Sequence, residues 1–176
     1  MHRIMIVDDE ENVSRALRRA LAKNDVEIEL FSCPHDALRR AQTANFDLVI
    51  SDYRMPEMDG IKLLSELKQL QPDAMRIIIS GHADLEGLIG AVNAAEIFRF
   101  ITKPWHDPDL TLAVRHALEH RAILVENRRL ADKVRAQRKE LDRQKTALQK
   151  WEADYPDQIR VSWAEDGSII LQEDDI

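Results

Sequence analysis

Acidic, hydroxyl and cationic residues follow directly after short apolar runs at several points of the chain. They are Asp8 and Asp9, Asp52, Ser80 and Lys103. Three carboxylates brought close together repel one another unless a cation lies among them. Magnesium prefers oxygen ligands and commonly bridges carboxylates to a phosphoryl group. A lysine ammonium can pair with phosphate oxygens, so this set of residues is typical of Mg²⁺-dependent phosphoryl transfer.

The apolar runs themselves predict the elements that would position these residues. The runs cover residues 4–7, 48–50, 77–79 and 98–101, with an alternating fifth candidate at 27–31. Continuous apolar runs suit strands that are buried on both faces, as in a parallel sheet, whereas alternation suits a strand nearer an edge. Between the runs, apolar residues recur with helical spacing. One such stripe consists of Val13, Ala16, Leu17, Ala20 and Leu21.

Strands that alternate with helices predict a doubly wound α/β domain with right-handed crossovers. We expect a flavodoxin-like, five-stranded parallel sheet in the order 2-1-3-4-5 over residues 1–122. Strands one and three are then neighbours at the topological switch point, where ligands bind. Asp8, Asp9 and Asp52 would converge there. Helix capping by aspartate would account for one of these carboxylates but not for the whole set.

The same segments resemble the response-regulator receiver domain of two-component signalling. The residues that carry the resemblance are 7–10, 52–60, 80–82 and 103–104, in order over about two-thirds of the chain. The resemblance implies that Asp52 accepts a phosphoryl group from a histidine kinase or a phosphotransfer protein. Because the segment after Lys150 is too short to be an output enzyme, we expect no other catalysis beyond self-phosphorylation from a phosphodonor and autodephosphorylation.

The resemblance also implies roles for the neighbouring residues. Asp9 and Asp52 would bind Mg²⁺ directly, Asp8 would act largely through water, and Arg54 would offer its backbone carbonyl. Arg54 and His82 occupy the two positions that tune the lifetime of the phosphoryl group in this family.

Three further residues would respond to the phosphoryl group once it is attached. Lys103 would hold one of its oxygens, Ser80 would move toward it, and Phe100 would turn inward as the switch aromatic. The Lys103-Pro104 peptide bond is cis in many members of the family, which an X-Pro bond permits.

The C-terminal part of the chain predicts a long helix that outgrows the domain. Residues 109–151 contain neither proline nor glycine. A weak heptad seam repeats along this segment, with polar residues interrupting it. Its members are Asn127, Val134, Leu141 and Leu148, with Leu130, Gln137, Gln144 and Trp151 as companions. We expect a helical or coiled-coil extension over residues 123–152.

The predicted output is a change in dimerisation or partner docking. It would use this coiled coil, the face formed by the fourth helix, fifth strand and last helix, or both. The output partner is not identified by the sequence.

Residues 153–176 form an acidic tail. Val161 and Trp163 alternate with polar residues, Asp166 and Gly167 offer a turn, and residues 169–171 are apolar, so a small β-hairpin is expected. The preceding helix carries an excess of six positive charges over residues 112–150. Its acidic residues are interleaved with the basic ones, which favours a solvated helix over nucleic-acid binding. Two alternatives stay open: a nucleic-acid regulator that uses this helix, and an adaptor that recruits an output enzyme.

Bulk properties narrow the class of protein. The net charge is −7 over 176 residues, which argues weakly against a nucleic-acid coat protein. Cys33 is the single cysteine, so an internal disulfide and a multi-cysteine metal site are excluded. The N-terminus reaches acidic residues too early for a signal peptide, and no stretch has membrane-spanning length. We therefore expect a cytoplasmic protein with no membrane partner.

Overall fold

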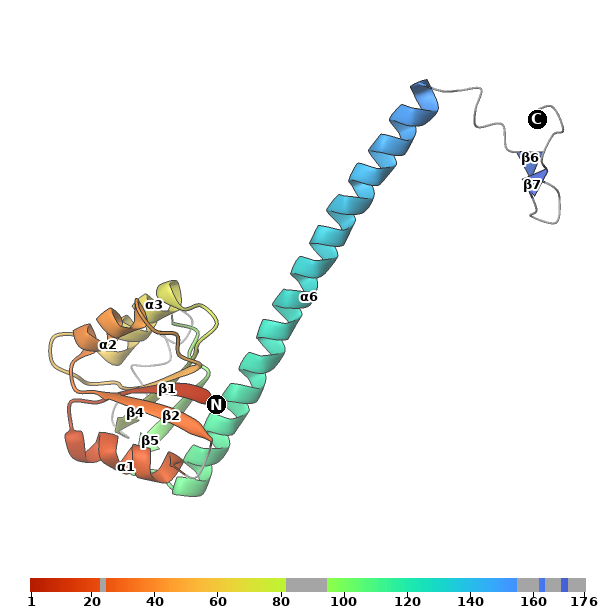
Figure 1. Ribbon diagram of the computed structural model, residues 1–176. Helices are drawn as coiled ribbons and strands as arrows, with labels where there is room; N and C mark the ends of the chain where they lie inside the picture. Colours follow the sequence, from red (N-terminus) through yellow and green to blue (C-terminus); the bar gives the residue numbers. More distant parts are fainter. Residues whose placement is uncertain (23–24, 82–94, 155–161, 164–168, 171–176) are drawn as a thin grey trace. The chain divides into compact units, whose positions relative to one another are not determined.

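The computed structural model of the protein describes residues 1–22, 25–81, 95–154, 162–163 and 169–170. Its centre is a five-stranded parallel sheet in the order β2-β1-β3-β4-β5 (Figure 1). The strands are β1 (His2–Val7), β2 (Val26–Phe31), β3 (Leu48–Asp52), β4 (Met75–Gly81) and β5 (Arg99–Lys103). This confirms the predicted fold and strand order, and the alternating run at 27–31 lies at an edge as expected.

Helices cover both faces of the sheet. They are α1 (Glu11–Leu21), α2 (Pro34–Ala41), α3 (Gly60–Leu70) and α6 (Asp107–Asp154). α2 and α3 lie on one face, whereas α1 and the first turns of α6 lie on the other (Figure 1). The spacing of Leu85, Leu88, Ile89 and Val92 predicts a further helix, and this segment lies outside the described residues.

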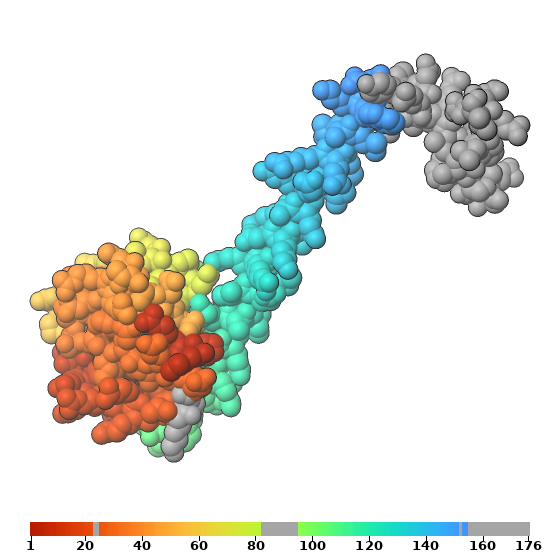
Figure 2. All heavy atoms as spheres, viewed as in Figure 1, coloured from red at the N-terminus to blue at the C-terminus, as the bar shows by residue number. Residues whose placement is uncertain are grey.

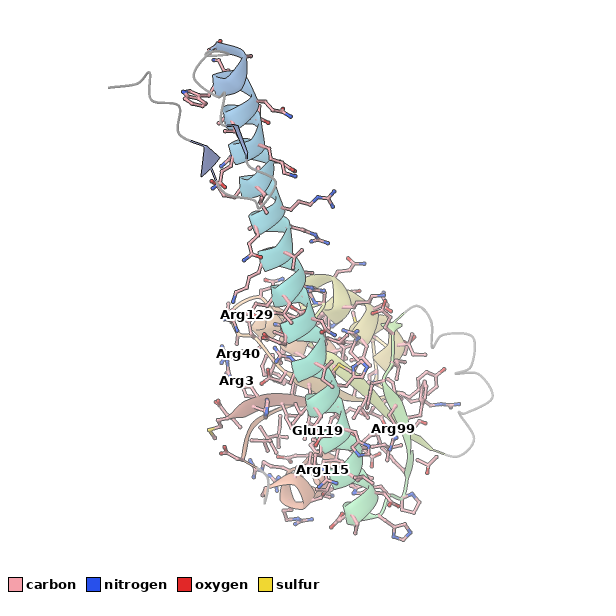
Figure 3. The ribbon with its side chains drawn as sticks, turned by 90° about the vertical axis from the view of Figure 1, so that its right-hand side faces the viewer. Arg3, Arg40, Arg99, Arg115, Glu119 and Arg129 are labelled. Atoms are coloured by element: carbon pink, nitrogen blue, oxygen red, sulfur yellow. The ribbon has the colours of Figure 1, made fainter. Side chains whose placement is uncertain are left out.

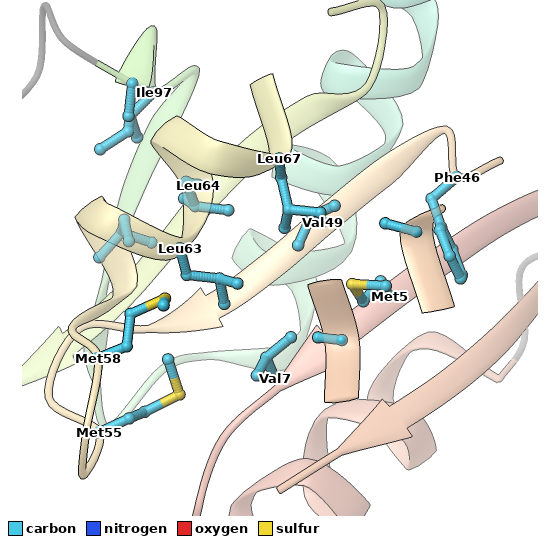
Figure 4. Close-up of a cluster of buried hydrophobic side chains, with 14 residues drawn as sticks. Met5, Val7, Phe46, Val49, Met55, Met58, Leu63, Leu64, Leu67 and Ile97 are labelled. Atoms are coloured by element: carbon cyan, nitrogen blue, oxygen red, sulfur yellow. The ribbon is translucent and has the colours of Figure 1, made fainter. Parts of the chain in front are cut away.

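Two apolar clusters follow from the strand periodicity of two. Met5 and Val7 of β1 point to the cluster beneath α2 and α3, where they meet Val49, Leu63 and other buried side chains (Figure 4). Ile4 and Ile6 point to the opposite cluster, which α1 and α6 cover. The central strands are therefore buried on both faces, which explains why their sequences are continuously apolar.

The sequence predicts Cys33 to be a small, half-buried helix residue, but Cys33 is the N-cap residue of α2, just before the helix begins. Pro34 occupies the first helical position, where its missing N–H costs nothing and its fixed φ suits the helix. The prediction of a half-buried cysteine is confirmed.

The chain divides into two compact units, Met1–Asn127 and Arg128–Ile176. Within the first unit, α6 contributes five buried residues to the core: Leu110, Ala113, Val114, Ala117 and Leu118. From residue 122 to Trp151, each α6 side chain is exposed. Figure 2 shows one side of this stretch as spheres. No helix within the described ranges is long and apolar enough to cross a bilayer.

The second unit contains the predicted hairpin strands. β6 (Ser162–Trp163) pairs antiparallel with β7 (Ile169–Ile170), so the alternating segment and the apolar segment of the tail lie side by side. The proposed division into residues 1–122, 123–152 and 153–176 remains a prediction.

Candidate functional site

The carboxyl ends of β1, β3 and β5 bring three of the predicted site residues together. Asp52 is the last residue of β3, Asp8 follows β1, and Lys103 is the last residue of β5. The ammonium nitrogen Nζ of Lys103 lies 2.9 Å from Oδ2 of Asp8 and 2.5 Å from Oδ1 of Asp52. One cation therefore bridges the two carboxylates that the sequence placed on neighbouring strands.

Loop amides hold the remaining oxygens of both carboxylates. The backbone N–H of Glu10 donates to Oδ1 of Asp8 at 2.8 Å, and that of Arg54 donates to Oδ2 of Asp52 at 2.8 Å. Asp8 is 1% exposed and Asp52 is 7% exposed. Each carboxylate is thus oriented by a loop on one side and by Lys103 on the other, and both are nearly withdrawn from water.

Burial and charge compete at this site. Burial raises the pKa of Asp8 above its ordinary value, although the hydrogen bond from Lys103 opposes this effect. Burial alone would lower the pKa of Lys103, but its hydrogen bonds to Asp52 and Asp8 outweigh burial and raise that pKa. The ammonium is therefore charged at neutral pH.

The donor set fits a hard divalent cation. Two buried carboxylates face one ammonium, so the cluster keeps a negative charge, and the exposed carboxylate of Asp9 follows directly in the chain. All the side-chain acceptors are oxygens, which Mg²⁺ prefers. The roles of Asp9 and of the Arg54 carbonyl as ligands remain predictions.

Ser80 carries an unused hydrogen-bonding group at the same edge. Asp52 pairs in register with Ile79 of β4, so Ser80 lies one residue beyond it on the neighbouring strand. Its hydroxyl is buried and finds no hydrogen-bond partner among the described residues. A buried polar group without a partner is costly and calls for an explanation, such as a ligand that arrives later.

The other predicted residues have different environments. Phe100 of β5 is half-buried and packs against the cluster beneath α2 and α3. The Lys103-Pro104 peptide bond is cis, as expected. His82 lies outside the described residues.

Gly60 contributes to the site in a way that the sequence did not reveal. A Cβ atom at this position would lie 2.1 Å from the backbone oxygen of Asp52. Its N–H also donates to the backbone oxygen of Tyr53 at 2.8 Å. The start of α3 therefore packs directly on the backbone of Asp52, and this contact depends on the tertiary fold and not on a local motif.

Comparisons with known proteins agree with this architecture. A family model described as response regulator receiver domain matches residues 4–115. The hydrogenase transcriptional regulatory protein HoxA of Bradyrhizobium diazoefficiens is 35% identical over 116 residues, which are 66% of this chain and 24% of that protein. The transcriptional regulatory protein FixJ of Rhizobium meliloti is 32% identical over 66% of this chain and 57% of its own length. This chain thus covers from about a quarter to just over half of these relatives.

Solved structures match the same region. The signal receiver domain of an HD domain-containing protein from Pseudomonas fluorescens Pf-5 superposes with a TM-score of 0.67 at 35% identity, covering 71% of this chain and 92% of that one. A response regulator receiver domain protein from Clostridium thermocellum gives a TM-score of 0.65 at 28% identity. The match covers 70% of this chain and 99% of that one.

Proposed function

Because the chain belongs to the response-regulator receiver family, we propose that its Asp52 carboxylate accepts a phosphoryl group from a histidine kinase or a phosphotransfer protein in the cytoplasm. The observation that carries this proposal is the Lys103 ammonium bound to the carboxylates of both Asp8 and Asp52. No further catalysis is proposed beyond self-phosphorylation from a phosphodonor and autodephosphorylation.

The residues of the site supply what the transfer needs. An oxygen of Asp52 forms the new bond to phosphorus while the bond to the donor's leaving group breaks, which leaves an acyl phosphate. Lys103 is within reach to pair with a phosphoryl oxygen, and the unused Ser80 hydroxyl can donate to another. Asp9, Asp52 and the Arg54 carbonyl would hold Mg²⁺, with Asp8 acting through water. The metal would neutralise charge on the phosphoryl oxygens.

The mass of the intact protein tests this proposal. After incubation with acetyl phosphate and Mg²⁺, the wild type should gain one phosphoryl group, and chelation of the metal should prevent the gain. Asp52→Asn should gain none. Asp36→Asn, which removes an exposed carboxylate of α2, is the matched control and should react like the wild type. A phosphoryl adduct on Asp52→Asn would refute the assignment.

The proposed output is a shift of a two-state equilibrium. Phosphorylation would draw Ser80 toward the phosphoryl group and Phe100 inward, which changes the outer face of β5. Ile101 of β5 and Trp105 pack with Leu110 of α6 in one cluster. A change at β5 therefore has a contiguous path into the base of α6, and the lifetime of the phosphoryl group would be tuned by Arg54 and His82.

The second unit supports homodimerisation as the readout. Its exposed large apolar residues on α6 are Leu130, Val134, Leu141, Leu148 and Trp151. Each of them occupies a seam position of the predicted heptads, whereas Asn127, Gln137 and Gln144 interrupt the seam. A second copy of the same helix would cover this seam, and its polar positions favour a reversible dimer.

Light scattering before and after acetyl phosphate tests the readout. Phosphorylation should change the fraction of dimer in the wild type. Leu141→Lys should leave a monomer under both conditions, and Ala136→Lys, outside the seam, should behave like the wild type. Ser80→Ala should still form the adduct but should respond less in its assembly. An unchanged dimer with Leu141→Lys would exclude the seam.

A second candidate function has one specific observation in its favour. Five cationic side chains lie on one face of α6 together with Asp142: Arg135, Arg138, Lys139, Arg143 and Lys150. Such a face attracts anions, including nucleic-acid backbones. Both HoxA and FixJ are named as transcriptional regulatory proteins. A salt-dependent mobility shift of DNA that is lost on replacing Arg138 and Lys139 would support this alternative.

A further inference from the structure

A cysteine, a histidine and a glutamate meet outside the phosphorylation site. Cys33 precedes α2, His35 is its second residue, and Glu57 lies in the loop between β3 and α3. The sulfur, one ring nitrogen and a carboxylate oxygen of these residues all lie within 4.8 Å of one another. Residues 24 positions apart in the chain thus present three different metal-binding atoms to one point.

Cys33 and Glu57 both lie on non-helical backbone. Cys33 has extended dihedral angles, and its side chain accepts no capping hydrogen bond from the described part of α2. Glu57 has a φ of 70°, in the left-handed region that a residue with a Cβ atom rarely adopts. Its carboxylate oxygen Oε2 lies 3.3 Å from Nδ1 of His35. The unusual loop conformation at Glu57 accompanies its approach to His35.

The spacing suits a tetrahedral ion. Zinc bonds of about 2.0–2.1 Å to nitrogen and oxygen give a tetrahedron edge of about 3.3–3.4 Å between those two ligands. The His35–Glu57 separation of 3.3 Å already has this length. An exposed ion pair between the two would contribute little by itself, and it would not require a thiol beside it.

We propose that Cys33, His35 and Glu57 bind one divalent zinc-class ion, with water as a fourth ligand. A thiolate and an imidazole select softer ions than the all-oxygen set around Asp52, so the two sites would prefer different metals. Glu57 lies in the loop whose Arg54 amide binds Asp52. The ion would therefore join the N-terminus of α2 to the loop that orients the phosphoacceptor.

Cobalt titration of the full chain tests the site without any measurement of activity. The metal-free protein, kept reduced, is titrated with Co²⁺ in excess Mg²⁺, which occupies the carboxylate site. A cobalt–thiolate charge-transfer band should grow to one Co²⁺ per chain, and Zn²⁺ should abolish it. Cys33→Ser should remove the band. His35→Ala and Glu57→Ala should each weaken Co²⁺ binding by about tenfold or more.

The control variant is His116→Ala, which removes an exposed histidine from α6 and should leave the titration unchanged. Thermal unfolding of each variant without metal checks that the fold is intact. The proposal is overturned if the wild type shows no charge-transfer band. It is equally overturned if His35→Ala and Glu57→Ala bind Co²⁺ like the wild type, because the cysteine would then bind alone.

Discussion

At Asp8, the demands of stability and of function oppose each other. The side chain is almost fully buried and its burial raises its pKa, so the ionised form that the site requires is unfavourable in the fold. Lys103 offsets part of this cost but is shared with Asp52. Ser80, whose buried hydroxyl has no hydrogen-bond partner in the described part of the chain, adds a second local cost. Such costs are typical of sites that await a ligand.

We expect Asp8→Asn to stabilise the fold while impairing phosphorylation. In the unfolded chain the pKa of Asp8 is near its ordinary value of 3.8, whereas in the folded chain Asp8 stays protonated up to a higher pH. Ionisation therefore costs stability, and this cost is fully present above the raised pKa. The variant should gain on the order of 1 kcal/mol in unfolding free energy at pH 7. Urea unfolding without Mg²⁺ measures this, and the gain should shrink as the pH falls toward 3.8. A variant less stable than the wild type would contradict the prediction.

At the scale of elements, the contacts between helices and strand ends decide where the site residues lie. The first residue of α3, Gly60, packs on the backbone of Asp52, and Asp59 caps α3 by accepting a hydrogen bond from the Lys62 N–H at 2.8 Å. The element that follows the proposed phosphoacceptor, Asp52, thus also contacts its backbone.

Gly60→Ala should disturb both folding and phosphorylation. The added Cβ would meet the backbone oxygen of Asp52, which cannot move without displacing β3. We expect a loss of about 1–3 kcal/mol in unfolding free energy and slower adduct formation. Gln69→Ala, at an exposed position of the same helix, is the control and should differ little. Chemical denaturation and intact mass measure the two effects. Wild-type behaviour of Gly60→Ala would show that the contact relaxes freely.

Glu29 lies on the edge strand β2 and links this strand to β1 and α2. Its carboxylate accepts hydrogen bonds from Arg40 of α2, at 2.8 and 3.1 Å, and from Arg3 of β1. Both arginines are labelled in Figure 3. The hydrogen bonds from Arg40, with the charges of Arg40 and Arg3, lower the pKa of Glu29. This cluster fastens α2 to the edge strand.

Glu29→Gln should therefore lower stability in a pH-dependent way. Because the pKa of Glu29 is lowered in the fold, its contribution is present above the ordinary value of 4.5 and disappears as the pH falls through the lowered value. We expect the unfolding free energy to fall by about 1 kcal/mol at pH 7, and this difference from the wild type should become smaller below pH 4.5. Glu27→Gln, on the same strand but more exposed, should lose less. Urea unfolding at several pH values measures both, and a loss independent of pH would contradict this account.

At the scale of the whole molecule, α6 serves two purposes along its length. Its first turns complete the core of the first unit, and Arg121 forms an ion pair with Asp47 through Nη1 and Oδ1 at 2.6 Å. Its later turns expose the seam of the second unit. The helix is continuous, so the proposed signal at β5 and the proposed dimer seam share one element.

Chains truncated within or before α6 test its role in the core separately from its proposed role in dimerisation. A chain that ends at Asn127 should unfold cooperatively, should form the adduct, and should no longer dimerise through the seam. A chain that ends at His106 should not fold, because each buried Leu or Val of α6 contributes about 1.5–3 kcal/mol against a total of about 5–15 kcal/mol. Circular dichroism and light scattering measure these outcomes. Cooperative folding of the shorter chain would show that α6 is dispensable to the core.

The sequence by itself predicted the strands and the polar residues at their ends. Apolar runs such as residues 48–50 are local patterns typical of a doubly buried strand, and the polar residues that follow each run mark the carboxyl edge of the sheet. The heptad seam is equally local, because a helix places residues seven apart on one side.

Only the tertiary structure decided which side chains meet. Lys103 bridges Asp8 and Asp52, Ser80 is left without a partner among the described residues, and Glu57 approaches Cys33 and His35. These outcomes depend on distances between residues that are far apart in the chain. They are set by strand register and by loop conformations such as the positive φ of Glu57. A one-dimensional pattern carries no information on such distances, because they arise only when the elements pack.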